Sequence, residues 1–187
     1  MRLFLAVTLP DEVRDGIASA TERVRTLLTR VAWVQPSLLH LTLKFVGERD
    51  AELVPRIAEA ARGVAAGAAP IATSLEGGGA FPNFPAPRVV WIGMTHASAL
   101  SALAVGLEDA LVPLGVPPER RAFRPHLTLG RVKGALSRDE GALLEREVRA
   151  LSGRWPLPVA HVELMRSELS SSGPRYTSLA TFPLGRS

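Results

Sequence analysis

Cysteine is absent from the 187-residue sequence. Disulfide bridges and thiolate chemistry are therefore excluded, together with the zinc motifs that depend on cysteine. A chain without cysteine suits a reducing compartment, and we expect the protein to be cytoplasmic. The sequence also has no HExxH motif, and no pair of acidic residues lies beside His40 or His126. These absences argue against a metal-dependent nuclease, and we expect neither a metal nor another cofactor.

Long apolar runs are missing as well. The first residues, MRLFLAVTLPDEV, carry only a short apolar stretch before Pro10, Asp11 and Glu12, so we expect no signal peptide. No run approaches the roughly 18 consecutive apolar residues of a membrane-spanning helix. Hydrophobic residues make up 47% of the chain and charged residues 21%, which is typical of a globular protein with its own core. We therefore expect one domain without a membrane segment.

Positive charge is in slight excess. The chain has 22 Lys and Arg residues, nearly all of them arginine, against 18 Asp and Glu, which gives a net charge of +4. Guanidinium groups form paired hydrogen bonds with phosphate oxygens, so this balance suits phosphate or RNA as a partner. A GC-rich coding sequence would also enrich arginine, alanine and glycine. Composition alone therefore leaves the partner open.

Two halves of the sequence resemble each other at an offset of 86 residues. The tetrapeptide HLTL begins at His40 and again at His126. The segment RLFLAV near the N-terminus falls on RVVWIG in the second half, and both are typical of β-strands. In each half, the spacing of apolar residues predicts the order strand, helix, strand, helix, strand. A closing hairpin with a turn at Gly173 and Pro174 follows the second half.

This repeat predicts an α+β fold made by duplication. We expect a single domain over residues 1–187, with a sequence repeat of about 1–86 and 87–187 that forms two pseudo-symmetric lobes. In such a bilobal fold, two antiparallel sheets form a central cleft and the helices pack on their outer faces.

Helix starts are indicated by residues that cap helices. Asp11 and Ser98 stand at the beginning of stretches with apolar residues at helical spacing. Ser137 is followed three residues later by Glu140, which is the pattern of a capping box. We expect Asp11, Ser98 and Ser137 each to be the N-cap of a helix.

Each HLTL copy has two chemically different faces. Alternate side chains of a strand point to opposite sides, so His40 and Thr42 share one face while the two leucines face the core. His126 and Thr128 are arranged in the same way. An approximate twofold relation between the halves would bring the two polar faces together across a groove. Two imidazoles that titrate near neutral pH can supply one acid and one base, and two hydroxyls can hold phosphate oxygens.

The motifs and their order resemble the 2H phosphoesterase superfamily, and within it the RNA 2′,3′-cyclic phosphodiesterase family, also called 2′-5′ RNA ligases. The resemblance spans nearly the whole chain, through RLFLAVTLP, LLHLTLKFVGE, GGGAFPNFPAPRVVWIG, FRPHLTLGRVK and VELMRSELSSSGPRY. It implies a bilobal α+β fold with a positive central cleft and no required metal or cofactor. It also implies hydrolysis of a terminal 2′,3′-cyclic phosphate to a 2′-phosphate.

The resemblance implies a role for each polar residue of the repeat. His40 is expected to protonate the leaving 3′-oxygen, and His126 to accept a proton from the attacking water. Thr42 and Thr128 are expected to hold the phosphate oxygens. Because the halves are nearly symmetric, the assignment of acid and base rests on the resemblance alone. The reverse reaction, with an RNA 5′-hydroxyl in place of water, would form a 2′-5′ linkage.

Other residues are candidates for substrate binding. Arg124 precedes His126 by two residues and is expected on the same face, near a phosphate; Lys44 shares the expected face of His40, although a solvated lysine fits the pattern as well. Phe81 could support a base or anchor the core, and Tyr176 could line the cleft or close the hairpin. Arg131 has the opposite parity from His126 unless a bulge intervenes at Gly130.

The remaining aromatic and histidine residues have no predicted role in chemistry. Trp33, Trp91 and Trp155 are expected to fill the core or its margin. His96 and His161 lack a threonine two residues later, and we assign them no catalytic function.

Two alternatives to the RNA-end enzyme remain open from the sequence. The same chemistry could act on a small nucleotide such as ADP-ribose 1″,2″-cyclic phosphate. A non-catalytic RNA-binding module would use the basic cleft only to anchor RNA. In the favoured interpretation the partners are RNA ends or nucleotides that carry a 2′,3′-cyclic phosphate, and the protein acts as a monomer.

Overall fold

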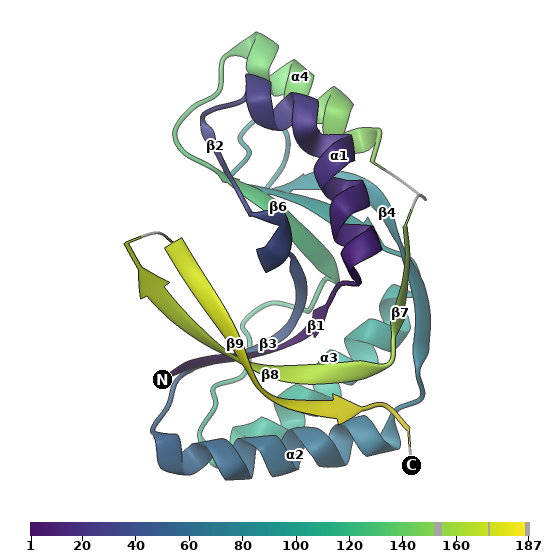
Figure 1. Ribbon diagram of the computed structural model, residues 1–187, viewed down its shortest axis with the longest axis vertical. Helices are drawn as coiled ribbons and strands as arrows, with labels where there is room; N and C mark the ends of the chain where they lie inside the picture. Colours follow the sequence, from purple (N-terminus) through teal and green to yellow (C-terminus); the bar gives the residue numbers. More distant parts are fainter. Residues whose placement is uncertain (152–154, 172, 186–187) are drawn as a thin grey trace.

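The protein folds into two antiparallel sheets with helices on their outer sides (Figure 1). A computed structural model describes residues 1–151, 155–171 and 173–185. The four-stranded sheet has the order β3 (His40–Glu48), β1 (Arg2–Thr8), β8 (His161–Ser170) and β9 (Gly173–Pro183). The five-stranded sheet has the order β2 (Val31–Trp33), β6 (His126–Val132), β5 (Val89–Met94), β4 (Ile71–Phe81) and β7 (Trp155–Val159). The predicted α+β class is confirmed.

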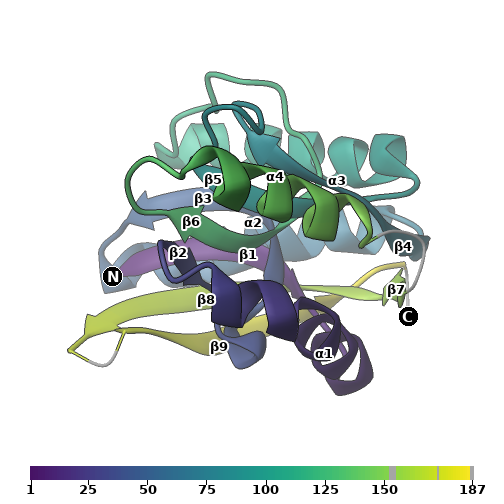
Figure 2. The same cartoon turned by 90° about the horizontal axis from the view of Figure 1, so that it is seen from above.

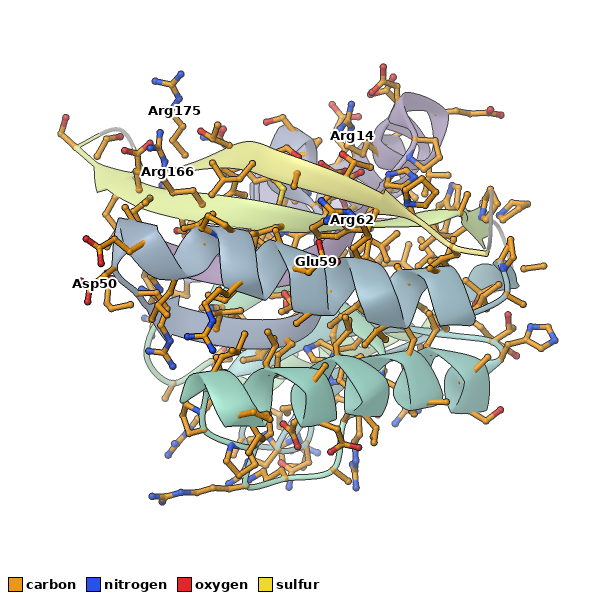
Figure 3. All side chains as sticks on the ribbon, turned by 90° about the horizontal axis from the view of Figure 1, so that it is seen from below. Arg14, Asp50, Glu59, Arg62, Arg166 and Arg175 are labelled. Atoms are coloured by element: carbon orange, nitrogen blue, oxygen red, sulfur yellow. The ribbon has the colours of Figure 1, made fainter. Side chains whose placement is uncertain are left out.

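Each sheet is covered by one pair of helices. Helices α2 (Val54–Gly67) and α3 (Ala97–Leu111) pack side by side on the four-stranded sheet (Figure 3). Helices α1 (Asp11–Leu27) and α4 (Arg138–Arg149) cover the five-stranded sheet (Figure 2). Short 3₁₀ turns precede β3, precede α2 and follow α3, at Pro36–Leu38, Ala51–Leu53 and Val112–Leu114. The sheets are thus buried on their outer faces, as predicted.

The amphipathic pattern of the helices decides which side faces the core. In α1, Val13, Ile17, Thr21 and Val24 are buried at helical spacing, which gives the helix one apolar stripe. In α3, four leucines at helical spacing are buried, namely Leu100, Leu103, Leu107 and Leu111. Among the described residues, Ala97–Leu114 is the one segment with the length and hydropathy of a membrane-crossing helix. Its leucines pack against α2 and β3 in the core.

The two halves of the sequence are interleaved in space. The four-stranded sheet joins β1 and β3 of the first half to β8 and β9 of the second. The five-stranded sheet joins β2 and β4 of the first half to β5, β6 and β7 of the second. Helices are exchanged too, because α1 packs with α4 and α3 packs with α2. The sequence repeat and the two sheets therefore divide the chain differently.

One of the three expected helix caps is confirmed. The Ser137 hydroxyl accepts a hydrogen bond from the Glu140 amide at 3.2 Å, and the Glu140 carboxylate accepts one from the Ser137 amide at 2.7 Å. The other two expectations were wrong, because the N-caps of α1 and α3 are Pro10 and His96. Asp11 lies instead in the first helical turn, where its negative charge interacts favourably with the helix dipole.

Each HLTL strand contains a β-bulge at the same position of the repeat. In β3 the pairing with β1 passes from Thr42 to Lys44, so Leu43 is the extra residue. In β6 the pairing with β5 passes from Thr128 to Gly130, so Leu129 is the extra residue. A bulge places two residues opposite one, so the residues after it point to the other face than strict alternation predicts.

Candidate active site

A cleft of about 860 Å³ lies between the two sheets. The four polar residues of the repeat all line it: His40, Thr42, His126 and Thr128. The leucines between them are buried on the opposite side of each strand, with Leu41 and Leu127 fully inaccessible to solvent. Each strand thus presents one histidine and one threonine to a shared space, as alternation predicts.

Both imidazoles are held by the same backbone interaction. Nδ1 of His40 lies 2.8 Å from the carbonyl oxygen of Leu38, and Nδ1 of His126 lies 2.7 Å from that of Arg124. A carbonyl oxygen only accepts hydrogen bonds, so Nδ1 of each ring carries the hydrogen and donates it. The second nitrogen, Nε2, is then left for proton transfer in each histidine. The pair can therefore supply one acid and one base of nearly equivalent construction.

An aromatic ring stands edge-on against each histidine. The rings of His40 and Tyr176 have centroids 5.2 Å apart and planes at 86°. The rings of His126 and Phe81 have centroids 5.1 Å apart and planes at 89°. Phe4 adds a second contact to His40 at 5.0 Å. These contacts restrict rotation of the imidazoles, and they place the predicted residues Phe81 and Tyr176 in the cleft wall.

Burial changes the pKa values of two cleft residues, His40 and Tyr176. Burial lowers the pKa of His40, and the hydrogen bond with Leu38 opposes this only in part. Burial also raises the pKa of the Tyr176 hydroxyl, against the positive charges of Arg2 and Arg131. Tyr176 is therefore a neutral hydroxyl at physiological pH, and burial shifts His40 towards its neutral form.

Arginines surround the histidines. Arg124 lines the cleft, as expected from its position two residues before His126. Arg131 also lines it and is exposed. Strict alternation places Arg131 on the face opposite His126, and the sequence suggested that only a bulge at Gly130 would change this. The bulge lies one residue earlier, at Leu129, and it turns Arg131 towards the cleft. Both guanidinium groups therefore line the cleft that contains the two histidines.

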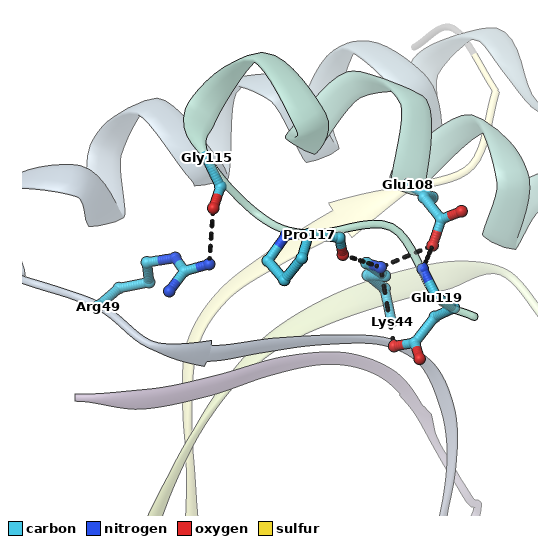
Figure 4. Close-up of polar contacts among 6 residues, drawn as sticks. All are labelled: Lys44, Arg49, Glu108, Gly115, Pro117 and Glu119. Atoms are coloured by element: carbon cyan, nitrogen blue, oxygen red, sulfur yellow. Dashed lines mark hydrogen bonds and ion pairs between the residues drawn. The ribbon is translucent and has the colours of Figure 1, made fainter.

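Lys44 does not share the face of His40, and this expectation was wrong. The bulge at Leu43 turns the lysine side chain towards α3, where only 1% of it is exposed. Its ammonium donates hydrogen bonds to the Glu108 carboxylate at 2.6 Å and to the Pro117 carbonyl at 2.9 Å (Figure 4). Glu119 lies 3.7 Å away as a second acidic partner. A buried ion pair occupies Lys44, so we do not assign it to the substrate.

Several cleft residues were not predicted from the sequence, among them Arg2, Phe45, Arg120 and Arg121. Phe45 faces the cleft because the bulge at Leu43 reverses its direction, and Arg2 lines the cleft from the neighbouring strand β1. Arg120 and Arg121 line it from the segment before β6. The arginines in ERRAFRP, directly before the second HLTL copy, could have indicated a phosphate-binding segment. No residue pattern in the sequence indicates the bulge.

The other two histidines lie outside the cleft. His96 is the N-cap residue of α3, and Nε2 of His161 lies 3.5 Å from the carboxylate of Glu163. Trp33 and Trp155 are partly buried against the core. Within the described residues, no group of three His, Asp or Glu side chains is placed to hold a metal ion.

Two imidazoles with free Nε2 atoms, two hydroxyls and several arginines in one cleft define a 2H phosphoesterase. The LigT like Phosphoesterase family matches the chain twice, at residues 7–91 and 92–176. The chain therefore belongs to this family.

Individual proteins resemble the chain over nearly its full length. The RNA 2′,3′-cyclic phosphodiesterase of Methanothermobacter thermautotrophicus is 38% identical over 98% of this chain and 99% of the relative. The crystal structure of TT0787 of Thermus thermophilus has a TM-score of 0.84 and 36% identity, and covers 100% of this chain and 99% of that chain. E. coli LigT complexed with 3′-AMP has a TM-score of 0.79 and 28% identity, with 98% and 97% covered.

Proposed function

We propose that the protein is an RNA 2′,3′-cyclic phosphodiesterase that hydrolyses the terminal cyclic phosphate to a 2′-phosphate. The observation that carries this proposal is the matched pair of imidazoles, each fixed through Nδ1 and each with Nε2 available in one cleft. The name of the M. thermautotrophicus relative supports the substrate. The arginines that line the cleft suit a phosphate that carries negative charge.

The reaction is an in-line displacement at phosphorus. His126 accepts a proton from water through Nε2 while the water oxygen bonds to phosphorus. The bond from phosphorus to the 3′-oxygen breaks, and His40, acting as an imidazolium with hydrogen on both ring nitrogens, donates its Nε2 proton to that oxygen. The products are a 3′-hydroxyl and a 2′-phosphomonoester, with one water consumed. Positioned acid and base groups of this kind typically contribute a factor of about 10²–10⁴ each to the rate.

The remaining side chains hold the charge that develops on the phosphate. Thr42 and Thr128 donate hydrogen bonds to the two non-bridging oxygens. Arg124 and Arg131 pair with the same oxygens, because donors that are already in place stabilise a transition state without reorganisation. Phe81 and Tyr176, which lie against the two histidines, form the walls that receive the terminal nucleoside.

The acid and base roles of the histidines follow the direction of the reaction. In hydrolysis, we assign His40 as the proton donor and His126 as the acceptor. When an RNA 5′-hydroxyl replaces water, the same steps form a 2′-5′ linkage in this site. When such a linkage is cleaved, the roles exchange: His40 takes the proton of the 3′-hydroxyl, and His126 gives one to the departing 5′-oxygen.

We further propose that the chain functions as a single domain over residues 1–187, as a cytoplasmic monomer without a metal or another cofactor. All groups assigned to the reaction come from one chain. An enzyme of this kind keeps its activity after dialysis against EDTA and elutes at the size of one chain in light-scattering chromatography.

The decisive experiment is incubation of an oligoribonucleotide ending in a 2′,3′-cyclic phosphate with the protein in EDTA. The expected product carries a 2′-phosphate, which is distinguished from a 3′-phosphate by mass spectrometry after selective phosphatase treatment. His40→Ala and His126→Ala should each reduce kcat/KM by at least about 10². Full activity in either variant contradicts the mechanism, and tight RNA binding without turnover identifies a non-catalytic module.

A second candidate substrate is a small cyclic nucleotide. The E. coli LigT structure contains 3′-AMP, a mononucleotide, which favours this possibility for the present cleft too. Turnover of ADP-ribose 1″,2″-cyclic phosphate and of a cyclic-phosphate RNA should be compared at equal concentration. A higher kcat/KM for the RNA supports the proposed function, and the opposite ratio supports the small nucleotide.

A further inference from the structure

The segment 119–124, with the sequence ERRAFR, forms one wall of the cleft. All its residues line the cavity, and Arg120, Arg121 and Arg124 are exposed. The segment connects the turn after α3 to the start of β6 at His126. It is therefore continuous with the candidate active site and passes from one helix layer to the opposite sheet.

The positive charge of this wall is not neutralised by the protein. Arg120, Arg121 and Arg124 make no ion pair or side-chain hydrogen bond with any residue in the described ranges. Two acidic residues line the same cleft, Glu108 and Glu119, and both are partners of Lys44. On the helices, three of the six exposed arginines contact a nearby carboxylate, namely Arg62, Arg146 and Arg149. The wall thus offers guanidinium groups to an external anion.

An exposed aromatic ring lines the same cleft as these arginines. Phe45 is 55% exposed and lines the cleft. It pairs across the strands with Phe4, which contacts the ring of His40. Phe45 follows Thr42 by three residues on β3, a separation of roughly 10 Å along an extended strand. At this distance from Thr42, the Phe45 ring can stack on the base of a neighbouring nucleotide, and not on the base of the terminal nucleotide that carries the cyclic phosphate.

The wall is anchored at both ends. At its start, Lys44 binds the Pro117 carbonyl, and Glu108 accepts a hydrogen bond from the Glu119 amide at 2.7 Å (Figure 4). At its end, the Arg124 carbonyl accepts the hydrogen bond from His126. A segment fixed at both ends can hold its arginines in place before a ligand arrives, which lowers the entropic cost of binding.

We propose that Phe45, Arg120 and Arg121 form a binding site for the single-stranded RNA that precedes the terminal cyclic phosphate. The inference rests on the proposed function, because the terminal ribose must occupy the site between the histidines. The two arginines pair with a backbone phosphate on the 5′ side, and Phe45 stacks on an unpaired base. Stacking on an aromatic ring requires an unstacked base, so the occupant is a single strand rather than a duplex.

With this site, the KM of the enzyme depends on the length of the substrate. A 2′,3′-cyclic mononucleotide fills the reaction centre but leaves Phe45 and the two arginines without a ligand. A longer RNA uses both, so its KM is lower while kcat is unchanged. Loss of one phosphate contact on a single strand reduces the slope of log affinity against log salt by about 0.7.

The test compares two substrates, 2′,3′-cyclic AMP and a ten-nucleotide RNA with a 2′,3′-cyclic end. The Arg120→Ala/Arg121→Ala variant should raise KM for the RNA about tenfold or more and leave kcat/KM for cyclic AMP unchanged. Phe45→Ala should raise KM for the RNA at least about fivefold. The control variant Arg23→Ala/Arg56→Ala removes the same charge from exposed sites on α1 and α2 outside the cleft.

The outcomes separate this inference from the proposed function. An unchanged KM for the RNA, an equal loss with both substrates, or an equal effect of the control variant overturns the strand-binding site. If the wild-type protein hydrolyses neither substrate, the proposed function fails. Fluorescence anisotropy with a labelled ten-nucleotide RNA ending in a 2′-phosphate then decides the inference alone. Weaker binding by the Arg120→Ala/Arg121→Ala variant supports it, and equal binding overturns it.

Discussion

Nζ of Lys44 lies 2.6 Å from Oε2 of Glu108, with the lysine side chain 1% exposed. Lys44 stands two residues after Thr42 of the first motif, and Glu108 lies on α3. The same carboxylate accepts a hydrogen bond from the amide of Glu119, and these hydrogen bonds lower the pKa of Glu108. The pair therefore joins the first HLTL strand to the segment that leads to His126.

Lys44→Met should lower the free energy of unfolding by about 2 kcal/mol, because the charge of Glu108 loses its buried partner. Urea denaturation measures this change. The double variant Lys44→Met/Glu108→Gln should recover part of the loss, since it leaves no unpaired charge, and the double-mutant cycle gives the coupling energy. Strictly additive effects of the two substitutions would contradict an interaction between these side chains.

The burial of His40 should be visible in the pH dependence of kcat/KM, which reports the free enzyme. Burial lowers the pKa of His40, so the inflection that His40 contributes lies below the usual value of about 6.5. Tyr176→Ala opens the side of the ring that Tyr176 covers and should move this inflection to higher pH. NMR titration of the histidine Cε1 protons assigns the change to His40.

Tyr176→Phe is the matched control for that titration. It keeps the ring that stands edge-on against His40 and removes only the hydroxyl. The inflection of His40 should then stay where it is in the wild-type protein. A shift of equal size in both variants would attribute the effect to the hydroxyl instead of to burial.

Arg131 should contribute to phosphate binding through its forked guanidinium group. Arg131→Ala should reduce kcat/KM for 2′,3′-cyclic AMP by about 10–100-fold, the value of a hydrogen bond to a charged group. Arg131→Lys should recover only part of this, because an ammonium cannot make the paired contact. Arg138→Ala, on the outer helix α4, is the control and should leave the rate unchanged. Full recovery by lysine would indicate a purely long-range charge effect.

The sequence predicted the parts of this site that depend on local periodicity. Alternation along HLTL placed His40 and Thr42 on the face opposite Leu41, and the capping box at Ser137 follows from a spacing of three residues. Both rules act within a few residues and need no knowledge of the partner strand. The α+β class followed from the same periodicities.

Long-range pairing decided what the sequence could not show. The bulge at Leu43 arises from the register of β3 against β1, and no glycine or proline marks it. Beyond it, Lys44 points to the core and Phe45 to the cleft, the reverse of the expected order. The partner of Lys44, Glu108, lies 64 residues away. The interleaving of the two halves also depends on which strands pair, which local patterns do not specify.

Gly79 should be required for the wall behind His126. A Cβ atom at Gly79 would lie 2.3 Å from the ring of Trp91, a distance that forces the indole to move. Trp91 packs against Phe81 with centroids 5.0 Å apart, and Phe81 stands edge-on against His126. Gly79→Ala should therefore lower both the thermal midpoint and kcat for the cyclic-phosphate substrate.

Gly63→Ala should stabilise the protein, in contrast to Gly79→Ala. A Cβ atom at Gly63, within helix α2, meets no atom within 4 Å. Alanine is favoured over glycine inside a helix by about 1 kcal/mol, so this variant should unfold at a higher temperature and keep full activity. Differential scanning calorimetry and kcat should be measured on both variants in parallel. A Gly79→Ala protein with wild-type kcat would show that His126 does not depend on the position of Trp91.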